Sequence, residues 1–587
     1  MKKYVLETTP LNRNTSKIET LLLGDWCNLD GENRGFKVVD YHWSDRKQLH
    51  LDYQRIFSLY EIYLKKLTIS LNEIHDVEHT IDYWRIVVGP WLYYFICIVF
   101  DRYQMLFKAS KKFDIKYTLE PQYNTDSWIP LDYIDFNYKF YSDEWNYYIF
   151  SEINKYTNLI DKKNSDYALF PSVLSKNDKR HWSKKIVKGL LFFLSKLTNK
   201  YLTKVLFVEI GIPQIYMYKL LFKLKTSPFS YFNRVRPKFF DINPAMRDNL
   251  NNNDICDNEF EKLLTSLISG NIPISYIEGY SQLVRESNNI FPKKTSIIVT
   301  ANAYFSNEHF KTWAALQKEH GAKLWITVHG GHHGTALFNG PGKLTEDNAD
   351  RFYSWGWGKY NLPSCKLSLL ADVNLTRSSN QILFIPYSLS KYSNHIDSSP
   401  ISSTFKNCLK MQFLFFNELS VHGLIDNLFI RIKDSQQMWN LHYEYKKYGI
   451  KNFILSDSET ILNSIKKSSL VIVTYDSTIF LETLTLNTPT CLFFNENLWE
   501  MSLLSKKHFK KFLECGILHF NENSLASHIV TYQNNYDEWW RSDVVQDSIQ
   551  DFLLEFGYSS NNWQKKWFDE VNNALSNIDI NTSNGIK

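Results

Sequence analysis

Short apolar runs alternate with helical patterns along the second half of this 587-residue chain. Residues 296–300 form a β-branched run, a helical pattern covers about 308–320 and stops at Gly321, and residues 323–328 form another apolar run. A strand, a helix and a second strand in this order make a βαβ unit, whose two strands lie parallel in one sheet. The alternation therefore predicts an α/β fold built on parallel sheets.

The same alternation resumes after residue 380. Strands are expected at 381–387, 428–432, 452–455, 470–474 and 490–494, and helices near 402–418, 435–447, 459–467 and 478–486. The polar run at 376–380 is typical of a hinge between two α/β halves. We therefore expect an N-terminal α/β domain over 1–375 and a Rossmann-like domain over 380–535. Helices over 536–587 are expected to pack back on the N-terminal half.

The N-terminal half has a less regular pattern. An apolar run at 20–23 ends in Gly24 and Asp25, which predicts a strand that enters a turn. Helical periodicity follows from about 45 to 113, and further helices are expected near 182–199 and 213–224. We interpret about 45–290 as a large helical insertion in the N-terminal domain.

Charge, cysteines and hydropathy exclude several classes of protein. The formal net charge of +5 is too small for a nucleic-acid binder, so no nucleic-acid partner is expected. Seven cysteines without a C-x-x-C pair argue against a disulfide framework or a structural zinc site, and favour a reducing compartment. The longest apolar run, 87–100, is shorter than the roughly 20 residues of a membrane span, and is interpreted as a buried helix. The beginning of the sequence lacks the apolar stretch of a signal peptide, so a cytoplasmic location is expected.

A loop rich in histidine and glycine follows the strand expected at 323–328. Its candidate residues are His329, Gly330, Gly331, His332 and His333. Glycine permits close approach of a ligand to the backbone, and histidine exchanges protons near neutral pH. Because ligands bind at the carboxyl ends of parallel strands, we interpret this segment as a substrate or phosphate loop. A metal site completed by Glu346 or Asp347 is an alternative, although the spacing fits no established zinc pattern. A surface turn that happens to hold histidines is the third interpretation.

A second candidate site lies where the strand at 470–474 gives way to a helix. Ser477 and Thr478 stand at the start of that helix, and the helix N-terminus attracts anions. Glu482 lies one turn further on the same face and could accept hydroxyl groups of a ribose or sugar. A simple helix cap explains the same residues, and the two interpretations are compatible.

Three further charged positions are candidates. Arg431 and Lys433 leave the end of an apolar strand on one face and could neutralise a diphosphate. Asp25 stands at a strand end and could act as the general base for an acceptor hydroxyl. Asp82 and Arg85 are better explained as a buried structural ion pair.

Several aromatic-rich blocks are spread over nearly the whole chain, at 22–27, 41–46, 71–75, 83–91, 328–332, 354–358 and 538–541. Together they resemble a family of transferases encoded in bacterial O-antigen and related surface-polysaccharide gene clusters. The resemblance implies the pathway, surface-polysaccharide assembly, more specifically than it implies the reaction that the protein catalyses.

Separately, residues 476–482 with 487–489 are similar to the donor-side motif of GT-B glycosyltransferases, in the style of Kdo-type capsule transferases and CDP-glycerol transferases. This resemblance implies a GT-B-like fold, with two Rossmann-like domains facing a cleft. It also implies that Ser477, Thr478 and Glu482 contact a nucleotide-sugar, and it places Arg431 and Lys433 at a basic strand end. The chain continues through 434–436 without the His-Pro that some of these relatives carry, so the identity of the donor stays open.

The leading hypothesis is a metal-independent GT-B glycosyltransferase that moves a sugar from a nucleotide-activated donor to a surface glycan, either O-antigen or capsule. His329 or Asp25 would take the acceptor proton, and His332 is a further catalytic candidate. No cofactor is expected, because a helix dipole and cations can stabilise the leaving phosphate. The alternatives are a CDP-polyol phosphotransferase and a non-catalytic module that binds a glycan or nucleotide-sugar. The expected partners are the nucleotide-sugar donor and a glycan or lipid-linked glycan acceptor, and the latter would favour peripheral association with the inner membrane.

Overall fold

The computed structural model describes residues 2–28, 36–171, 203–226, 236–251, 258–373, 375, 380–433 and 438–584. The chain divides into two compact units. Unit 1 comprises residues 1–209, 226–324 and 391–396, and unit 2 comprises residues 210–225, 325–390 and 397–587. The helix expected at 182–199 and most of the hinge expected at 376–380 lie outside the described residues.

Unit 1 contains a five-stranded parallel sheet with the order β3-β2-β1-β4-β5. Its strands are β1 (Tyr4–Glu7), β2 (Glu19–Leu22), β3 (Lys37–Val38), β4 (Ile115–Gln122) and β5 (Lys162–Ala168). A further parallel pair joins β6 (Val205–Val208) to β7 (Ile297–Thr300). The order β3-β2-β1-β4-β5 is that of a doubly wound sheet, in which the chain starts at the central strand and proceeds to each edge in turn.

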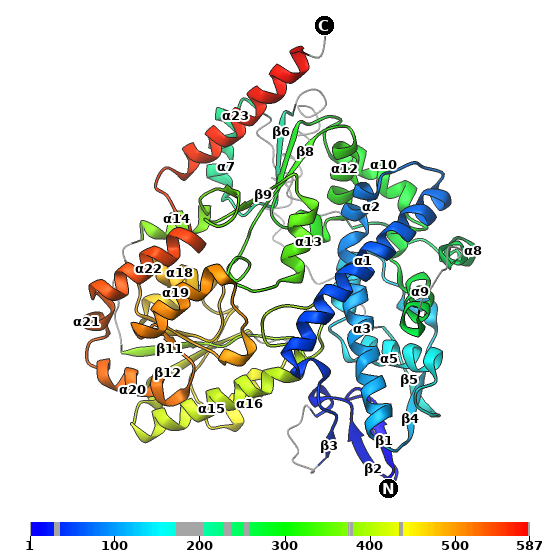
Figure 1. Cartoon of the computed structure of the whole chain (residues 1–587), viewed down its shortest axis with the longest axis horizontal. Helices are drawn as coiled ribbons and strands as arrows, with labels where there is room; N and C mark the ends of the chain where they lie inside the picture. Colours follow the sequence, from blue (N-terminus) through cyan, green and yellow to red (C-terminus); the bar gives the residue numbers. More distant parts are fainter. Residues whose placement is uncertain are drawn as a thin grey trace. The chain divides into compact units, whose positions relative to one another are not determined.

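Helices supply most of the remaining mass of unit 1 (Figure 1). They are α1 (Arg46–His75), α2 (Ile81–Val87), α3 (Gly89–Lys112), α4 (Tyr133–Lys139), α5 (Asp143–Thr157), α8 (Pro244–Asp248), α9 (Glu259–Asn271), α10 (Tyr280–Ile290), α11 (Ala303–Ser306) and α12 (Glu308–Glu319). The span expected to be a helical insertion, about 45–290, thus contains the helices of this unit from α1 to α10, together with β4, β5 and β6. The polar sequence of β5, nearly all of it exposed at a sheet edge, explains why apolar periodicity did not predict it.

The apolar run at 87–100 is buried, as expected. It begins at the end of α2 and continues into α3, and every described residue but Tyr94 in this run is fully buried. No single helix of the described chain is long and apolar enough to cross a membrane. The pair α2 and α3, bent by 68°, passes that test only when the two helices are joined.

Unit 2 contains a six-stranded parallel sheet with the order β13-β12-β11-β14-β15-β16. The strands are β11 (Gln381–Ile385), β12 (Leu428–Ile432), β13 (Phe453–Leu455), β14 (Ser468–Val473), β15 (Thr490–Phe493) and β16 (Leu518–His519). The first five confirm the strands expected from the sequence to within two residues at their ends. The spatial order corresponds to 3-2-1-4-5-6, the order of the Rossmann fold, so the α/β prediction with parallel sheets is confirmed.

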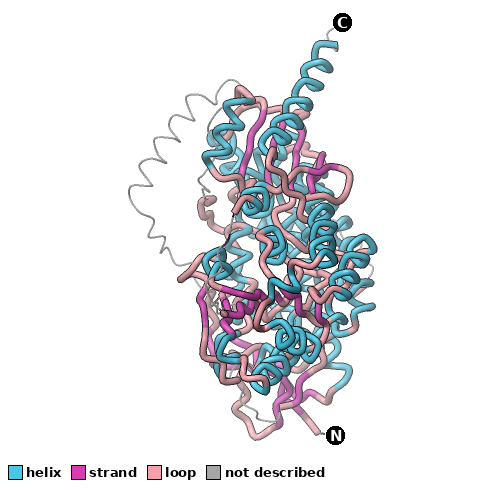
Figure 2. Tube along the Cα trace, turned by 90° about the vertical axis from the view of Figure 1, so that its left-hand side faces the viewer, coloured by secondary structure: helices cyan, strands magenta, loops and turns pink. Residues whose placement is uncertain are grey.

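Helices flank this sheet on both faces (Figure 1), and Figure 2 shows the helices and strands of the whole chain in separate colours. They include α15 (Phe405–Val421), α16 (Leu441–Lys447), α17 (Ile461–Lys466), α18 (Thr478–Thr485), α19 (Leu503–Glu514) and α20 (Glu522–Tyr532). The C-terminal part is helical as expected, in α21 (Tyr536–Trp540), α22 (Asp543–Phe556) and α23 (Trp563–Asn584). Unit 2 also holds α7 (Gln214–Lys223), most of β8 (Lys323–Thr327), α13 (Gly340–Asn348), β9 (Arg351–Ser354), β10 (Tyr360–Asn361) and α14 (Cys365–Ala371).

The aromatic-rich blocks of the sequence lie largely in the cores of the two units. The Trp43 indole donates to Asp52 at 2.9 Å, and the Trp84 indole donates to Asn72 at 2.8 Å. In unit 2 the Trp540 indole donates to Asn487 at 2.6 Å. A buried tryptophan usually needs such a partner for its N–H group, so these blocks serve packing in the first place.

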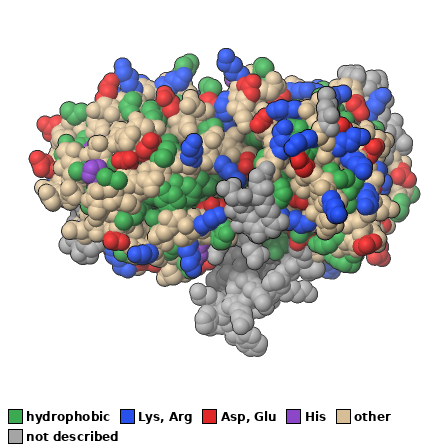
Figure 3. All heavy atoms as spheres, turned by 90° about the horizontal axis from the view of Figure 1, so that it is seen from below, with side chains coloured by type: hydrophobic (Ala, Val, Ile, Leu, Met, Phe, Trp, Pro, Cys, Tyr) green, Lys and Arg blue, Asp and Glu red, His purple; other side chains and the backbone are tan. Residues whose placement is uncertain are grey.

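The charged surface agrees with the small net charge. On the face seen in Figure 3, Lys and Arg side chains are mixed with Asp and Glu side chains. Arg85 pairs mainly with Glu61 of α1, through a contact at 2.9 Å, and more distantly with Asp82 at 3.7 Å. Asp82 is more than half exposed, so the pair expected from the sequence exists but is only partly buried.

Candidate functional site

The start of α18 stands at the topological switch point of the six-stranded sheet. Strand β14, which precedes α18, lies beside β11, and the winding of the chain reverses between these two strands. In doubly wound sheets ligands bind at the carboxyl ends of the strands that flank this point. Ser477 is the N-cap of α18, and Thr478 is its first residue.

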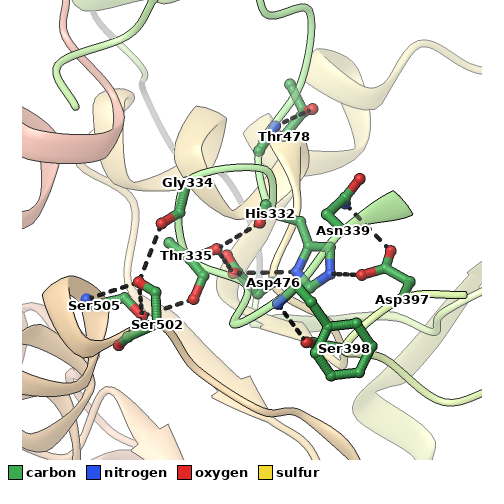
Figure 4. Close-up of polar contacts among 12 residues, drawn as sticks. His332, Gly334, Thr335, Asn339, Asp397, Ser398, Asp476, Thr478, Ser502 and Ser505 are labelled. Atoms are coloured by element: carbon green, nitrogen blue, oxygen red, sulfur yellow. Dashed lines mark hydrogen bonds and ion pairs between the residues drawn. The ribbon is translucent and has the colours of Figure 1, made fainter. Parts of the chain in front are cut away.

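The histidine-glycine loop contacts this helix start directly, within unit 2. The Gly331 N–H donates to the Thr478 hydroxyl at 3.0 Å, across 147 residues of sequence (Figure 4). A Cβ atom on Gly331 would lie 2.5 Å from the Ser477 carbonyl carbon, and one on Gly330 would lie 2.9 Å from Thr478 Oγ1. Real Cβ atoms do not come this close to backbone atoms, so the contact requires glycine at position 331. The first two candidate sites of the sequence are thus one site.

His332 is held between two carboxylates. Its Nε2 lies 3.0 Å from Asp397 Oδ1, and its Nδ1 lies 3.6 Å from Asp476 Oδ2 (Figure 4). The backbone at His332 is left-handed, with φ of +71°, a conformation that a residue with a side chain keeps only where its surroundings impose it. The ring also meets Trp499 edge-on, with 5.3 Å between the ring centres.

These carboxylates determine the charge of His332. Burial alone would lower its pKa, but the charges and hydrogen bonds of Asp397 and Asp476 outweigh burial and raise the pKa to about 10. His332 is therefore an imidazolium at neutral pH. A protonated ring cannot remove a proton from an acceptor, so His332 fits a positioning or electrostatic role better than that of a base.

Thr335 ties the loop to the rest of unit 2. Its hydroxyl contacts the Asp476 carboxylate and the His332 carbonyl oxygen, the latter at 3.0 Å. Its carbonyl oxygen accepts from the Ser502 N–H at 2.8 Å and from the Ser505 hydroxyl at 2.7 Å. The loop is thereby fixed to the starts of both α18 and α19 (Figure 4).

The other two histidines of the loop have different surroundings. His333 Nε2 lies 3.0 Å from Glu346 of α13, and the ring packs against Phe352. Glu346, which the metal interpretation used as a ligand, is thus the partner of His333. The His329 side chain is exposed and makes no hydrogen bond within the described part of the chain.

Ser477 does not act as a simple cap. Its hydroxyl makes no capping bond to α18, and its oxygen is buried without a hydrogen-bond partner among the described residues. A buried polar atom without a partner is costly, and a bound ligand is one way to satisfy it. The capping interpretation therefore does not account for the Ser477 side chain.

The remaining predicted donor residues have protein partners or lie apart. Glu482 is buried, and its carboxylate pairs with Lys366 of α14. The Arg431 guanidinium donates to the Ser464 hydroxyl and to the carbonyl oxygens of Ser456 and Glu459, at 2.7 to 3.2 Å. These contacts fix the segment between β13 and α17 and use much of the capacity of the guanidinium.

Two predicted residues complete the account. Lys433 is exposed just beyond β12. Asp25 belongs to unit 1, where it is half-buried in a short 3₁₀ helix (Asp25–Cys27) after β2, whereas His329 and His332 belong to unit 2. The structure therefore gathers the loop glycines, His332, Ser477 and Thr478, whereas the side chains of Arg431 and Glu482 contact Ser464 and Lys366 instead.

Sequence reasoning missed the two acids that hold His332. Asp476 lies just beyond a predicted strand, after Tyr475, so its position at the carboxyl edge of the sheet was a usable signal. Asp397 comes from an irregular segment, where it bridges to Asn339 through an isolated antiparallel pair. No periodicity or motif marks it.

Comparison with known proteins identifies the family. No curated protein matches the chain. Among solved structures, it is similar to the wall teichoic acid polymerase TagF, with 13% identity and a TM-score of 0.32, over 67% of this chain and 96% of TagF. It is also similar to MurG of Acinetobacter baumannii, with 9% identity and a TM-score of 0.31, over 63% of this chain and 99% of MurG. TM-scores this low are too small to support a structural or functional assignment. The model of the LIC12162 family transferase matches residues 4–571, nearly the whole length, and the chain therefore belongs to the LIC12162 family of transferases.

Proposed function

We propose that this protein transfers a sugar from a nucleotide-activated donor to a surface-glycan acceptor, and that it binds the donor phosphates at the start of α18. The observation that carries the proposal is the direct contact of the loop glycines with Ser477 and Thr478 at the switch point of the sheet. The N-terminal N–H groups of a helix attract phosphate, and glycine allows a phosphate to approach the backbone closely.

In this proposal the buried Ser477 hydroxyl donates to the donor phosphates, which would provide its missing partner. Thr478 and the Gly331 N–H hold the loop against the helix. His332, fixed by Asp397 and Asp476, positions the loop and keeps its own proton. As the bond between the sugar and phosphate breaks, negative charge grows on the leaving phosphate and the helix dipole stabilises it.

His329 is the proposed general base. It lies just beyond β8, after Val328, and its side chain is exposed. Partial desolvation, and then the charge of the nearby His333, lower the pKa of His329 below its ordinary value, so the ring is neutral at pH 7. It would take the proton of the acceptor hydroxyl while that oxygen bonds to the sugar carbon and the nucleotide leaves.

The proposal extends to the architecture. Residues 380–535 would hold the donor and residues 1–375 the acceptor, in a GT-B-like arrangement without a metal ion. Glu482, Arg431 and Lys433 would complete the donor side only if Glu482 and Arg431 exchange their protein partners for ligand. The acceptor would be an O-antigen or capsule glycan, free or lipid-linked, and a lipid-linked acceptor would bring the protein to the inner membrane.

The test is a thermal-shift screen of the full chain against nucleotides and nucleotide-sugars with uracil, guanine, thymine and cytosine bases. A ligand at about 100 times its dissociation constant stabilises the protein by about 2.7 kcal/mol. We expect a shift with one base, lost in Ser477→Ala and kept in Ser576→Ala, which removes an exposed serine hydroxyl of α23. The absence of any shift from folded protein would contradict the proposal. The product mass then separates sugar transfer from polyol-phosphate transfer.

A further inference from the structure

A second cluster of chemically active side chains lies at the β16 edge of the six-stranded sheet. Cys491 is on β15, His519 is on the neighbouring strand β16, and His528 is on α20. One ligand atom from each residue lies within 4.8 Å of the other two. Cys491 and His519 are buried, and His528 is half-buried. Among the described residues, no other group of three His, Cys, Asp or Glu side chains brings one ligand atom each this close together.

The hydrogen bonds of His519 determine which nitrogen is free to bind a metal. Its Nε2 lies 3.0 Å from the Gly516 carbonyl oxygen, which can only accept, so Nε2 carries the proton. Its Nδ1 lies 2.9 Å from the Ser524 hydroxyl and therefore offers a lone pair. A backbone carbonyl that holds one ring nitrogen while the other has a lone pair is the usual support of a metal-binding histidine. A metal ion would replace only the Ser524 hydroxyl.

His528 supplies an independent observation. Its Nε2 is buried and has no hydrogen-bond partner among the described residues. The ring is fixed edge-on against Trp539, with 4.3 Å between ring centres, and it also meets Tyr532 at 5.0 Å. An oriented ring nitrogen without a partner is unfavourable in a protein interior unless a ligand satisfies it.

Burial disfavours the charged form of each of the three side chains. It lowers the pKa values of His519 and His528 and raises the pKa of the Cys491 thiol, so the thiol must lose its proton when a metal ion binds. Neutral imidazole is the form that binds metal ions. The Cys491 thiol is buried and makes only a weak contact, at 4.0 Å, with the Gly516 carbonyl oxygen.

We propose that Cys491, His519 and His528 bind one divalent metal ion of the zinc type, a site that goes beyond the proposed transfer reaction. Thiolate and imidazole are the ligands that zinc prefers. On binding, the Cys491 S–H bond breaks, its proton goes to solvent, and a sulfur–metal bond forms without any change of oxidation state. Zinc bonds of about 2.0–2.3 Å separate ligand atoms by roughly 3.3–3.7 Å, so small side-chain rotations close the site.

The role of such an ion would be structural. Strand β16 has only two residues and forms the edge of the sheet, and α20 follows it directly. A metal ion would link both elements to β15. The site contains no C-x-x-C pair, and the absence of such a pair was the reason why the sequence argued against a structural zinc site.

The test uses the tag-free full chain, stripped with a chelator, dialysed and titrated with Co²⁺. We expect one equivalent of Co²⁺ to produce the charge-transfer absorption of a thiolate–cobalt bond, and Zn²⁺ to abolish it. Cys491→Ala should remove this absorption, whereas Cys408→Ala, which removes another buried thiol of unit 2, should keep it. His528→Gln retains a side chain of similar size and should weaken Co²⁺ binding at least about tenfold.

Two results would overturn the inference. One is the absence of the charge-transfer absorption in the wild-type protein. The other is an unchanged Co²⁺ affinity in His528→Gln, and this variant tests the metal site even if Cys491→Ala does not fold. The nucleotide-induced thermal shift of His528→Gln should equal that of the wild type. Failure of the metal site is therefore distinguishable from failure of the proposed donor site.

Discussion

The contact between the histidine-glycine loop and α18 can be tested with one methyl group. In Gly331→Ala the new Cβ atom would lie 2.5 Å from the Ser477 carbonyl carbon and 2.7 Å from the Ser477 oxygen. Ordinary van der Waals contact begins near 3.4 Å, so the loop and the helix start must separate by roughly 1 Å. Both neighbours are backbone atoms and cannot rotate away, unlike the end of a side chain.

Such overpacking costs about 1–3 kcal/mol. The separation also lengthens the bond from the Gly331 N–H to Thr478, which is 3.0 Å long in the structure. For a cooperative unit of 150–250 residues, 1 kcal/mol changes Tm by roughly 2–4 °C, so we expect a decrease of several degrees. The nucleotide-induced thermal shift should disappear as well, because the loop and Ser477 no longer form one site.

The assay is thermal unfolding of the two proteins with and without the nucleotide found in the screen. Gly270→Ala is the matched control, because a Cβ atom at this helical position of α9 meets no atom within 4 Å. It should leave both Tm and the nucleotide shift at or slightly above the wild-type values. Equal behaviour of Gly331→Ala and Gly270→Ala would refute the argument that this contact builds the site.

Two further predictions concern charged groups of unit 2. His332 has a folded-state pKa of about 10, above its unfolded value of about 6.5, so its stabilising contribution is complete below pH 6.5 and declines as the pH rises to 10. The free energy of unfolding in urea should therefore differ between wild type and His332→Gln by an amount that shrinks as the pH is raised from 6 to 8 and 10. A difference that stays constant with pH would contradict the ion pairs. Lys366→Met leaves the buried Glu482 carboxylate without its cation and should lower the unfolding free energy by about 1–3 kcal/mol, measured at pH 7. Lys359→Met, at an exposed lysine of the same unit, is its control, and equal stability of the two variants would show that the pair contributes nothing.

Much of the fold could be predicted because it depends on local sequence. Strands β11, β14 and β15 are buried along most of their length because both faces of the sheet are covered, and their apolar runs can be recognised in the sequence without knowledge of the neighbouring strands. Helices α1 and α3 show their periodicity over many turns. By contrast, β5 pairs only along one side, exposes polar residues and resembles a loop in sequence.

The candidate site could be predicted only in part. The loop glycines and Ser477 were found because they follow strands, and parallel strands present their carboxyl ends at one edge. The mutual contact of Gly331 and Thr478 was beyond prediction, because it depends on how two distant segments are brought together in unit 2. The roles expected for Arg431 and Glu482 remain predictions, since Arg431 donates to backbone carbonyl oxygens and Glu482 pairs with Lys366, groups that neighbour them only in space.

The sequence by itself determined the α/β class, the alternation of strands and helices, and the chemical types of side chain available at the strand ends. Tertiary structure alone decided that His332 is an imidazolium, because Asp397 and Asp476 reach it from segments far apart in the chain. It also decided that Cys491, His519 and His528 meet at one point. Periodicity is a property of neighbouring residues, whereas pKa values and ligand geometry depend on atoms within a few ångströms in space, and only folding brings those atoms together.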